Sequence, residues 1–153
     1  MKWKKLAVTA AATSMAVGLN VPSANAAATR SAFQATPYTA GCLDYTADYG
    51  PYVITCNFGD YQTWYNDDAL AYTALRQKAT GLCLTARNGL LAMKPCLADD
   101  PAAFWRVTKD NWLVAQIKNS VTGTCLARNK YARVQLSTCT GGDSQRWSVI
   151  TVG

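Results

Sequence analysis

Six cysteines are the residues in this 153-residue sequence whose spacing most directly indicates chemistry. They form three pairs separated by 14, 13 and 14 positions: Cys42 with Cys56, Cys83 with Cys96, and Cys125 with Cys139. No pair has the CxxC spacing of a zinc site, and the chain contains no histidine, so a metal centre is a much weaker interpretation than disulfides.

Groups that could act as catalytic acids or bases are few. All nine acidic residues are aspartates, and there is no histidine or glutamate. On a strand, the adjacent pairs Asp67-Asp68 and Asp99-Asp100 would point to opposite faces and could not work together as an acid–base couple. We interpret both pairs as turn residues. Because the cysteines are paired as well, no nucleophile–base arrangement can be assembled. The sequence therefore predicts a protein that is not an enzyme and needs no metal or cofactor.

The cysteine pairs belong to a repeat of about 41 residues. The first cysteines lie at positions 42, 83 and 125, and Trp64, Trp105 and Trp147 follow the same step. Since each copy holds its own pair, we predict the disulfides Cys42–Cys56, Cys83–Cys96 and Cys125–Cys139. The three copies cover residues 30–69, 70–111 and 112–153 approximately. Three copies are enough to bury a shared core.

The first 26 residues have the pattern of a secretory signal peptide. Three early lysines precede an apolar run over residues 6–19, and Ala24-Asn25-Ala26 follows as a cleavage site. That run is too short to cross a membrane, and no later segment is long and apolar enough to do so. We therefore expect cleavage after Ala26, a secreted extracellular domain over residues 27–153, and no membrane span.

Charge argues against a nucleic-acid partner. Without the three lysines of the leader, twelve basic residues face nine aspartates, a net charge of +3. The basic residues form no cluster that could follow a line of phosphates.

Short strands and turns position these residues. The segment Val134-Gln135-Leu136-Ser137 alternates apolar and polar residues, and the segments 112–117 and 148–152 also suit strands. Asn88-Gly89 and Gly50-Pro51 lie midway between paired cysteines, where a hairpin must turn. Residues 68–78 have some helical character, but we interpret them as a loop that leads into a strand. About four strands per copy predict an all-β barrel of twelve short strands.

The repeated motif resembles the ricin B-type β-trefoil lectin repeat, in which Gly-x-Cys-Leu is followed by a second cysteine and then by Gln-x-Trp. The resemblance covers about residues 31–152. Gln62-Thr63-Trp64 and Gln145-Arg146-Trp147 match, whereas Ala103 replaces the glutamine of the middle copy. The resemblance implies a β-trefoil with pseudo-threefold symmetry. We expect its three tryptophans to fill the core rather than to bind a ligand.

In this family the sugar site of a repeat uses an aspartate after Gly-x-Cys-Leu, an aromatic residue two positions before the second cysteine, and a polar residue ahead of the glutamine. The first copy keeps Asp44 and Gln62, but Ile54 and Tyr61 occupy the other two positions. Tyr52 lies two residues before Ile54, so on a strand both would share a face. The candidate residues for binding a carbohydrate or a partner are therefore Asp44, Tyr52, Ile54, Tyr61 and Gln62.

The other two copies have lost more of this set. The second copy has Thr85, Lys94, Ala102 and Ala103 at the four positions. The third copy has Ala127, Ser137 and Ser144 and keeps only Gln135 and Gln145. No copy is complete, so the resemblance implies a degenerate sugar site.

The first copy is also rich in tyrosine. Six of the eight tyrosines fall in it: Tyr38, Tyr45, Tyr49, Tyr52, Tyr61 and Tyr65. They could cover a small core, form a modified sugar site, or form a patch for a protein partner.

Two functions remain. The first is a secreted, non-catalytic carbohydrate-binding protein that binds a glycan weakly. The alternative is an interaction or adhesion subunit of a secreted multi-subunit complex, such as a toxin particle, whose partner is another secreted protein.

Overall fold

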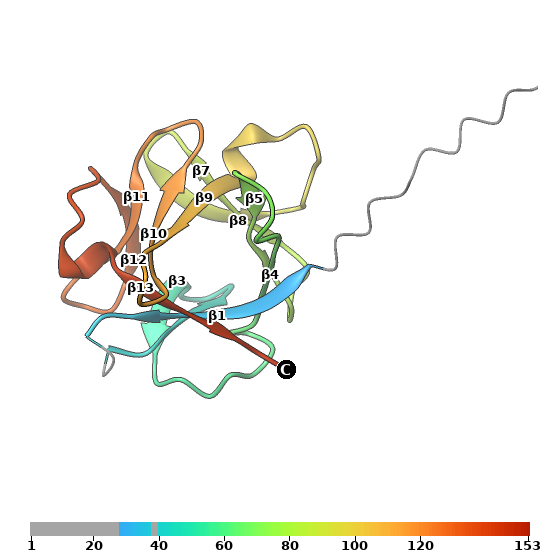
Figure 1. Cartoon of the computed structure of the whole chain (residues 1–153). Coiled ribbons are helices and arrows are strands. Elements are labelled where there is room, and N and C mark those ends of the chain that lie inside the picture. Colours follow the sequence, from blue (N-terminus) through green and yellow to red (C-terminus); the bar gives the residue numbers. More distant parts are fainter. Residues whose placement is uncertain (1–27, 38–39) are drawn as a thin grey trace, which may run out of the picture.

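The computed structural model describes residues 28–37 and 40–153. The predicted signal peptide, Tyr38 and Thr39 lie outside the described residues. Within the described part, the chain forms thirteen strands and two 3-10 helices and contains no α-helix. Figure 1 shows the strands arranged as a ring around a common centre.

The strands fall into three groups that follow one another along the chain. The first group is β1 (Thr29–Ala35), β2 (Cys42–Thr46), β3 (Gly50–Ile54) and β4 (Trp64–Asn66). The second is β5 (Thr73–Ala74), β6 (Arg76–Gln77), β7 (Cys83–Arg87), β8 (Leu90–Lys94) and β9 (Phe104–Lys109), with helix η2 (Pro101–Ala103) before β9. The third is β10 (Val114–Asn119), β11 (Cys125–Arg128), β12 (Val134–Ser137) and β13 (Trp147–Thr151), with helix η3 (Asp143–Gln145) before β13.

Six strand positions close a barrel. Strand β1 pairs with β13 and β4, β4 pairs with β6, β5 pairs with β9, and β10 pairs with β9 and β13, all antiparallel. Strands β5 and β6 occupy one position, because only Leu75 separates them. The remaining strands form three hairpins, β2–β3, β7–β8 and β11–β12, that contact one another through β3, β8 and β12. This is the predicted β-trefoil, with thirteen strand segments in place of twelve because of the break at Leu75.

The predicted turns are confirmed in one hairpin and displaced in another. Asn88 and Gly89 both have positive φ and connect β7 to β8, as a two-residue hairpin turn requires. Gly50-Pro51, in contrast, begins strand β3, and residues 47–49 make the turn. The segment 68–78 is a loop followed by β5 and β6, as expected.

The predicted strand 112–117 begins later than the sequence indicates. Trp112 and Leu113 lie in the turn before β10, where Asp110 Oδ1 accepts hydrogen bonds from the backbone N–H groups of Trp112 and Val114. Leu113 has a φ of 59° there, so apolar character alone misplaced this strand boundary.

Core and cross-links follow the repeat. The tryptophans Trp64, Trp105 and Trp147 are all fully buried. Disulfides join Cys42 to Cys56, Cys83 to Cys96, and Cys125 to Cys139. Each closes a loop of about 15 residues, which is worth on the order of 3 kcal/mol by the loop-entropy estimate.

The substitution Trp147→Ala should lower the free energy of unfolding by about 3–5 kcal/mol, because the cavity left by a buried indole cannot collapse fully. Trp112→Ala is the matched control: its side chain is 81% exposed, so the loss should stay within about 0.5 kcal/mol. Urea unfolding of both variants measures the difference. Equal losses would contradict the assignment of Trp147 to the core.

Candidate carbohydrate site on the first hairpin

The hairpin β2–β3 brings three of the five predicted site residues to one face. Asp44 lies directly opposite Tyr52, and Cys42 lies opposite Ile54. Leu43 and Val53 pair on the other face, in the core. Because side chains alternate along a strand, Asp44, Tyr52 and Ile54 therefore share the outer face of the hairpin.

Asp44 is more enclosed than a surface ligand would be. Its side chain is 4% exposed, and its Oδ1 atom is buried with no hydrogen-bond partner in the described structure. A carboxylate oxygen that is shielded from water and unpaired is costly, because burial removes its hydration without replacing it. Thr46 Oγ1, on the same strand, is also buried without a partner, but a carboxylate oxygen is the more costly of the two to leave unpaired.

Tyr52 is the cross-strand neighbour of Asp44, and the two side chains interact. Burial, and next the negative charge of Asp44, raise the pKa of Tyr52 above its ordinary value of 10.0. The upward direction of the pKa shift agrees with a protonated hydroxyl that interacts with the Asp44 carboxylate as a hydrogen-bond donor. Its ring centroid lies 5.7 Å from that of Tyr49, which is 62% exposed.

The third repeat completes this surface. The backbone of Tyr52 forms a β-bridge with Arg133, and the N–H of Val53 donates to the carbonyl of Ala132 over 2.8 Å. The Arg133 guanidinium lies 5.5 Å from the ring centroid of Tyr49 and donates a hydrogen bond to the carbonyl of the same tyrosine. Sequence reasoning missed Arg133, because the contact joins residues 84 positions apart and no local pattern indicates it.

Gln62 has a different role from the other predicted site residues. Its side chain is fully buried. The Oε1 atom accepts hydrogen bonds from the N–H groups of Asn57 and Phe58, and Nε2 donates to the carbonyl of Thr55. All of these partners are backbone groups of one loop, so Gln62 shapes the loop and presents no free group to a ligand.

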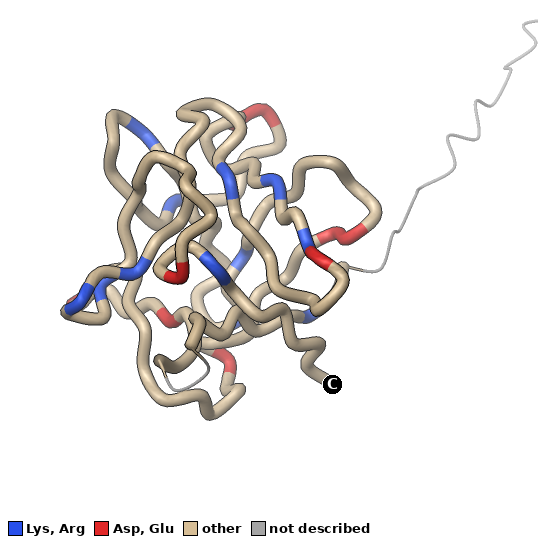
Figure 2. The backbone as a smooth tube through the Cα atoms, turned by 60° about the vertical axis from the view of Figure 1, so that its left-hand side comes forward, with Lys and Arg blue, Asp and Glu red and all other residues tan. Residues whose placement is uncertain are grey.

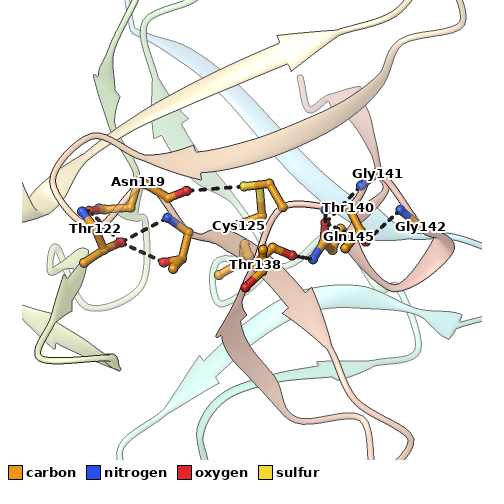
Figure 3. Close-up of a disulfide and its surroundings, with 12 residues drawn as sticks. Asn119, Thr122, Cys125, Thr138, Thr140, Gly141, Gly142 and Gln145 are labelled. Carbon is orange, nitrogen blue, oxygen red and sulfur yellow. Dashed lines mark hydrogen bonds between the residues drawn. A yellow bond between two sulfur atoms is a disulfide. The ribbon is translucent and has the colours of Figure 1, made fainter.

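Gln145 repeats this arrangement in the third copy. Its Oε1 accepts from the N–H groups of Thr140 and Gly141, and its Nε2 donates to the carbonyl of Thr138 (Figure 3). In the second copy Ala103 replaces the glutamine and is itself buried. There Asp100 caps helix η2 by accepting from the N–H of Ala102, and it also pairs with Arg87.

Ile54 and Tyr61 are exposed, at 47% and 50%. The backbone carbonyl of Tyr61 accepts a hydrogen bond from Gln77 Nε2, which also donates to the carbonyl of Tyr45 and so holds the Tyr61 loop beside β2. Tyr45 packs against the core, whereas Tyr65 lies under the guanidinium of Arg76. The tyrosines of the first copy therefore divide between core cover and exposed surface.

The positions equivalent to Asp44 in the other two copies are buried. Thr85 is buried, and its hydroxyl donates to the carbonyl of Ala92 within the same hairpin. Ala127 is also buried. Neither copy offers a carboxylate at the position equivalent to Asp44.

Comparison with known proteins identifies the family. The sequence matches the ricin-type beta-trefoil lectin domain over residues 32–147. The chain belongs to this family. No curated protein matches the sequence of this lectin domain.

Solved structures share the fold of the lectin domain. The designed threefold-symmetric protein ThreeFoil is 19% identical, with a TM-score of 0.67 over 80% of this chain and 99% of that one. The cytolethal distending toxin of Haemophilus ducreyi is 18% identical, with a TM-score of 0.67 over 79% and 82% of the two chains. SeviL, solved bound to asialo-GM1 saccharide, is 15% identical, with a TM-score of 0.64 over 80% and 97%. At these identities the likeness shows the fold alone.

The substitution Gln62→Ala should destabilise the lectin domain by about 1–3 kcal/mol, because it leaves two backbone N–H groups and one carbonyl without partners. Asp44→Asn is the comparison variant and should leave the melting temperature nearly unchanged, since Oδ1 makes no hydrogen bond and the amide oxygen of asparagine can still accept from the Tyr52 hydroxyl. Thermal unfolding measures both. A loss with Asp44→Asn as large as that with Gln62→Ala would show that Asp44 is structural.

The environment of Tyr52 can be measured by its ultraviolet absorbance at alkaline pH. Tyr52→Phe should remove a component of the tyrosine titration that appears above pH 10.0, because burial and Asp44 both oppose formation of the phenolate. Tyr131→Phe, which removes an exposed phenol, should leave that component in place. Persistence of the late component in Tyr52→Phe would contradict the enclosed position of Tyr52.

Proposed function

We propose that the protein is an exported, non-catalytic lectin that binds a glycan weakly through one reduced site on the hairpin β2–β3. Membership of a carbohydrate-binding family supports this function. Three disulfides suit the oxidising environment outside the cell, and the leader pattern of residues 1–26 agrees with export. Among the described residues, no helix is long and apolar enough to cross a membrane.

The observation that carries the proposal is the unpaired Oδ1 of Asp44. A sugar presents adjacent hydroxyl groups, and a carboxylate accepts hydrogen bonds from such donors strongly. Because Tyr52 is only partly buried, a turn of its side chain would open a path to Asp44 without disturbing the core. A sugar hydroxyl would then satisfy the buried oxygen.

The rest of the outer face suits the apolar side of a sugar ring. Tyr52 offers an aromatic surface next to Asp44, and Ile54 is exposed beside it. The equivalent positions of the other two copies lack a carboxylate, so a single site would act without help from multivalency. We therefore expect low affinity for a monosaccharide.

A non-catalytic role agrees with the positions of the paired aspartates. Asp67 accepts a hydrogen bond from the N–H of Ala69, and Asp68 pairs with Lys109. Asp100 caps a short helix and pairs with Arg87. Each pair contributes to a turn, and within the described residues no group of metal-ligating side chains occurs.

The alternative is an interaction subunit of a secreted complex. The enclosure of Asp44 favours it, as do the exposed side chains of Tyr49, Phe58 and Tyr61, since aromatic residues are frequent anchors of protein interfaces. The fold is also shared with a cytolethal distending toxin. In this case the trefoil scaffold would be kept while sugar contacts were replaced by protein contacts.

A glycan array separates the two functions. The purified protein should bind a limited set of glycans weakly, and Asp44→Asn or Tyr52→Ala should abolish that signal, because they remove the acceptor and the stacking surface. Trp112→Ala is the matched control, since it removes an exposed aromatic side chain outside this hairpin and should bind as the unmodified protein does.

The same protein should be used in parallel to capture partners from the culture medium of the producing cell. A blank array together with stoichiometric retention of one secreted protein would support the subunit. A strong glycan signal that survives Asp44→Asn would refute the placement of the site on this hairpin and would direct attention to Gln135 and Tyr131 of the third copy.

A further inference from the structure

Three equivalent cross-strand pairs surround the barrel, one for each core tryptophan. One member of each pair is the residue directly after a core tryptophan. The other member lies opposite it on the neighbouring strand and is itself paired, on its other side, with the first cysteine of a repeat. The pairs are Tyr65 with Arg76, Ser148 with Gln34, and Arg106 with Lys118. The pseudo-threefold symmetry allows these three environments to be compared directly.

The third pair differs from the other two in its electrostatics. The guanidinium of Arg76 lies 4.8 Å from the ring centroid of Tyr65, which is a favourable cation–π contact. The pair of Ser148 and Gln34 carries no charge. Arg106 also lies over an aromatic ring, that of Tyr72, but its strand partner Lys118 carries a second positive charge directly opposite, an arrangement that destabilises a sheet.

In the described part of the chain, no aspartate forms an ion pair with either of these two cations. Four other basic residues do form ion pairs with aspartates: Lys78, Arg87, Lys109 and Arg146. Figure 2 shows blue Lys and Arg segments on several parts of the backbone, interspersed with red Asp segments and not arranged in one continuous stripe.

Arg106 and Lys118 line a hollow of about 250 Å³ together with Tyr72 and residues 119–123. No carboxylate is among the residues that line it. Liquid water takes about 30 Å³ per molecule, so the hollow is larger than an isolated inorganic anion needs and has room for a ring beside the anion.

The walls of the hollow are held in place before any ligand binds. The Arg106 guanidinium lies 4.8 Å from the ring centroid of Tyr72. The side chain of Asn119 donates to the carbonyl of Ala102 and accepts from the N–H groups of Val121 and Thr122, which fixes the loop at the rim. Figure 3 shows Asn119 and Thr122 side by side in this loop. A site whose walls are already ordered loses little entropy when it binds.

We propose that this hollow binds the acidic group of a charged sugar, a carboxylate or a sulfate ester, between Arg106 and Lys118. An anion there would turn an unfavourable pair of like charges into a charge-assisted contact on both sides. The inference rests on the proposed lectin function for the sugar, and it adds a second site, built by β9 and β10, that is separate from the hairpin β2–β3. Two cations without a basic stripe suit one acidic sugar group better than a nucleic-acid backbone.

The test is calorimetric titration of the purified protein with a sulfated disaccharide of the heparin type, with its desulfated counterpart, and with inorganic sulfate. The sulfated sugar should bind at least about tenfold more tightly than either other ligand, because only it carries both the anion and the ring. The double substitution Arg106→Gln with Lys118→Gln should weaken that binding by at least tenfold, and added salt should weaken it in the unmodified protein.

Lys94→Gln is the matched control, since it removes one exposed positive charge at the end of β8, outside the hollow, and should leave the affinity unchanged. The double variant should melt close to the temperature of the unmodified protein, because removal of the repulsion offsets loss of the contact between Arg106 and Tyr72, and its melting temperature relative to the unmodified protein should be higher at low salt than at high salt. This measurement separates loss of the site from loss of folding.

Equal affinity for inorganic sulfate and the sulfated sugar would overturn the assignment of a sugar. Equal affinity for the sulfated and desulfated sugars, or an equal loss in Lys94→Gln, would overturn the site itself. Failure of the site on β2–β3 can be distinguished from failure of this hollow. If the sulfated sugar still binds to Asp44→Asn and no neutral glycan binds to the unmodified protein, the proposed site on β2–β3 is refuted and the hollow is supported.

Discussion

A hydrogen bond from each core tryptophan holds the barrel and the hairpins together. The indole N–H groups of Trp64, Trp105 and Trp147 donate to the carbonyl oxygens of Leu43, Leu84 and Leu126, over 3.1, 2.8 and 3.0 Å. A buried indole must find a partner for its N–H, and here the partner belongs to the first strand of the hairpin in the same repeat. One residue per repeat thus fills the core and fixes the hairpin against the barrel.

Both candidate sites lie one residue away from these bonds. Asp44 follows Leu43, and Arg106 follows Trp105. Side chains alternate between the two faces of a strand, so the residue next to Leu43 or Trp105 lies on the face away from the core. Its position is fixed because its neighbour is held in the core by the indole hydrogen bond. The core contacts therefore determine where a ligand-binding side chain can lie, and the residue type at that position determines which ligand group it can bind.

This division explains how much the sequence could predict. The step between tryptophans and between cysteines indicated the trefoil and its disulfides, because those residues make the repeated core contacts. The interaction of Asp44 with Tyr52 could not be predicted, since it depends on the register of β2 against β3. The contact of Arg133 with Tyr49 was equally inaccessible, because it joins hairpins of different repeats. The position of Trp112 in a turn was missed because Asp110 binds the local backbone and outweighs the preference of apolar residues for a strand.

The middle repeat shows how the fold tolerates such change. The glutamine of the other two repeats satisfies three backbone groups, yet Ala103 replaces it without leaving the core open. Helix η2, capped by Asp100 and held by Asn119 Nδ2 at the carbonyl of Ala102, supplies a different solution in the same place. Asn119 also orders the rim of the hollow that holds Arg106 and Lys118. The hollow therefore lies at the junction of two repeats: the middle repeat supplies Tyr72 and Arg106, and the third repeat supplies residues 118–123. A repeat that has lost the sugar residues of its family can therefore still contribute one wall of a hollow that it shares with the next repeat.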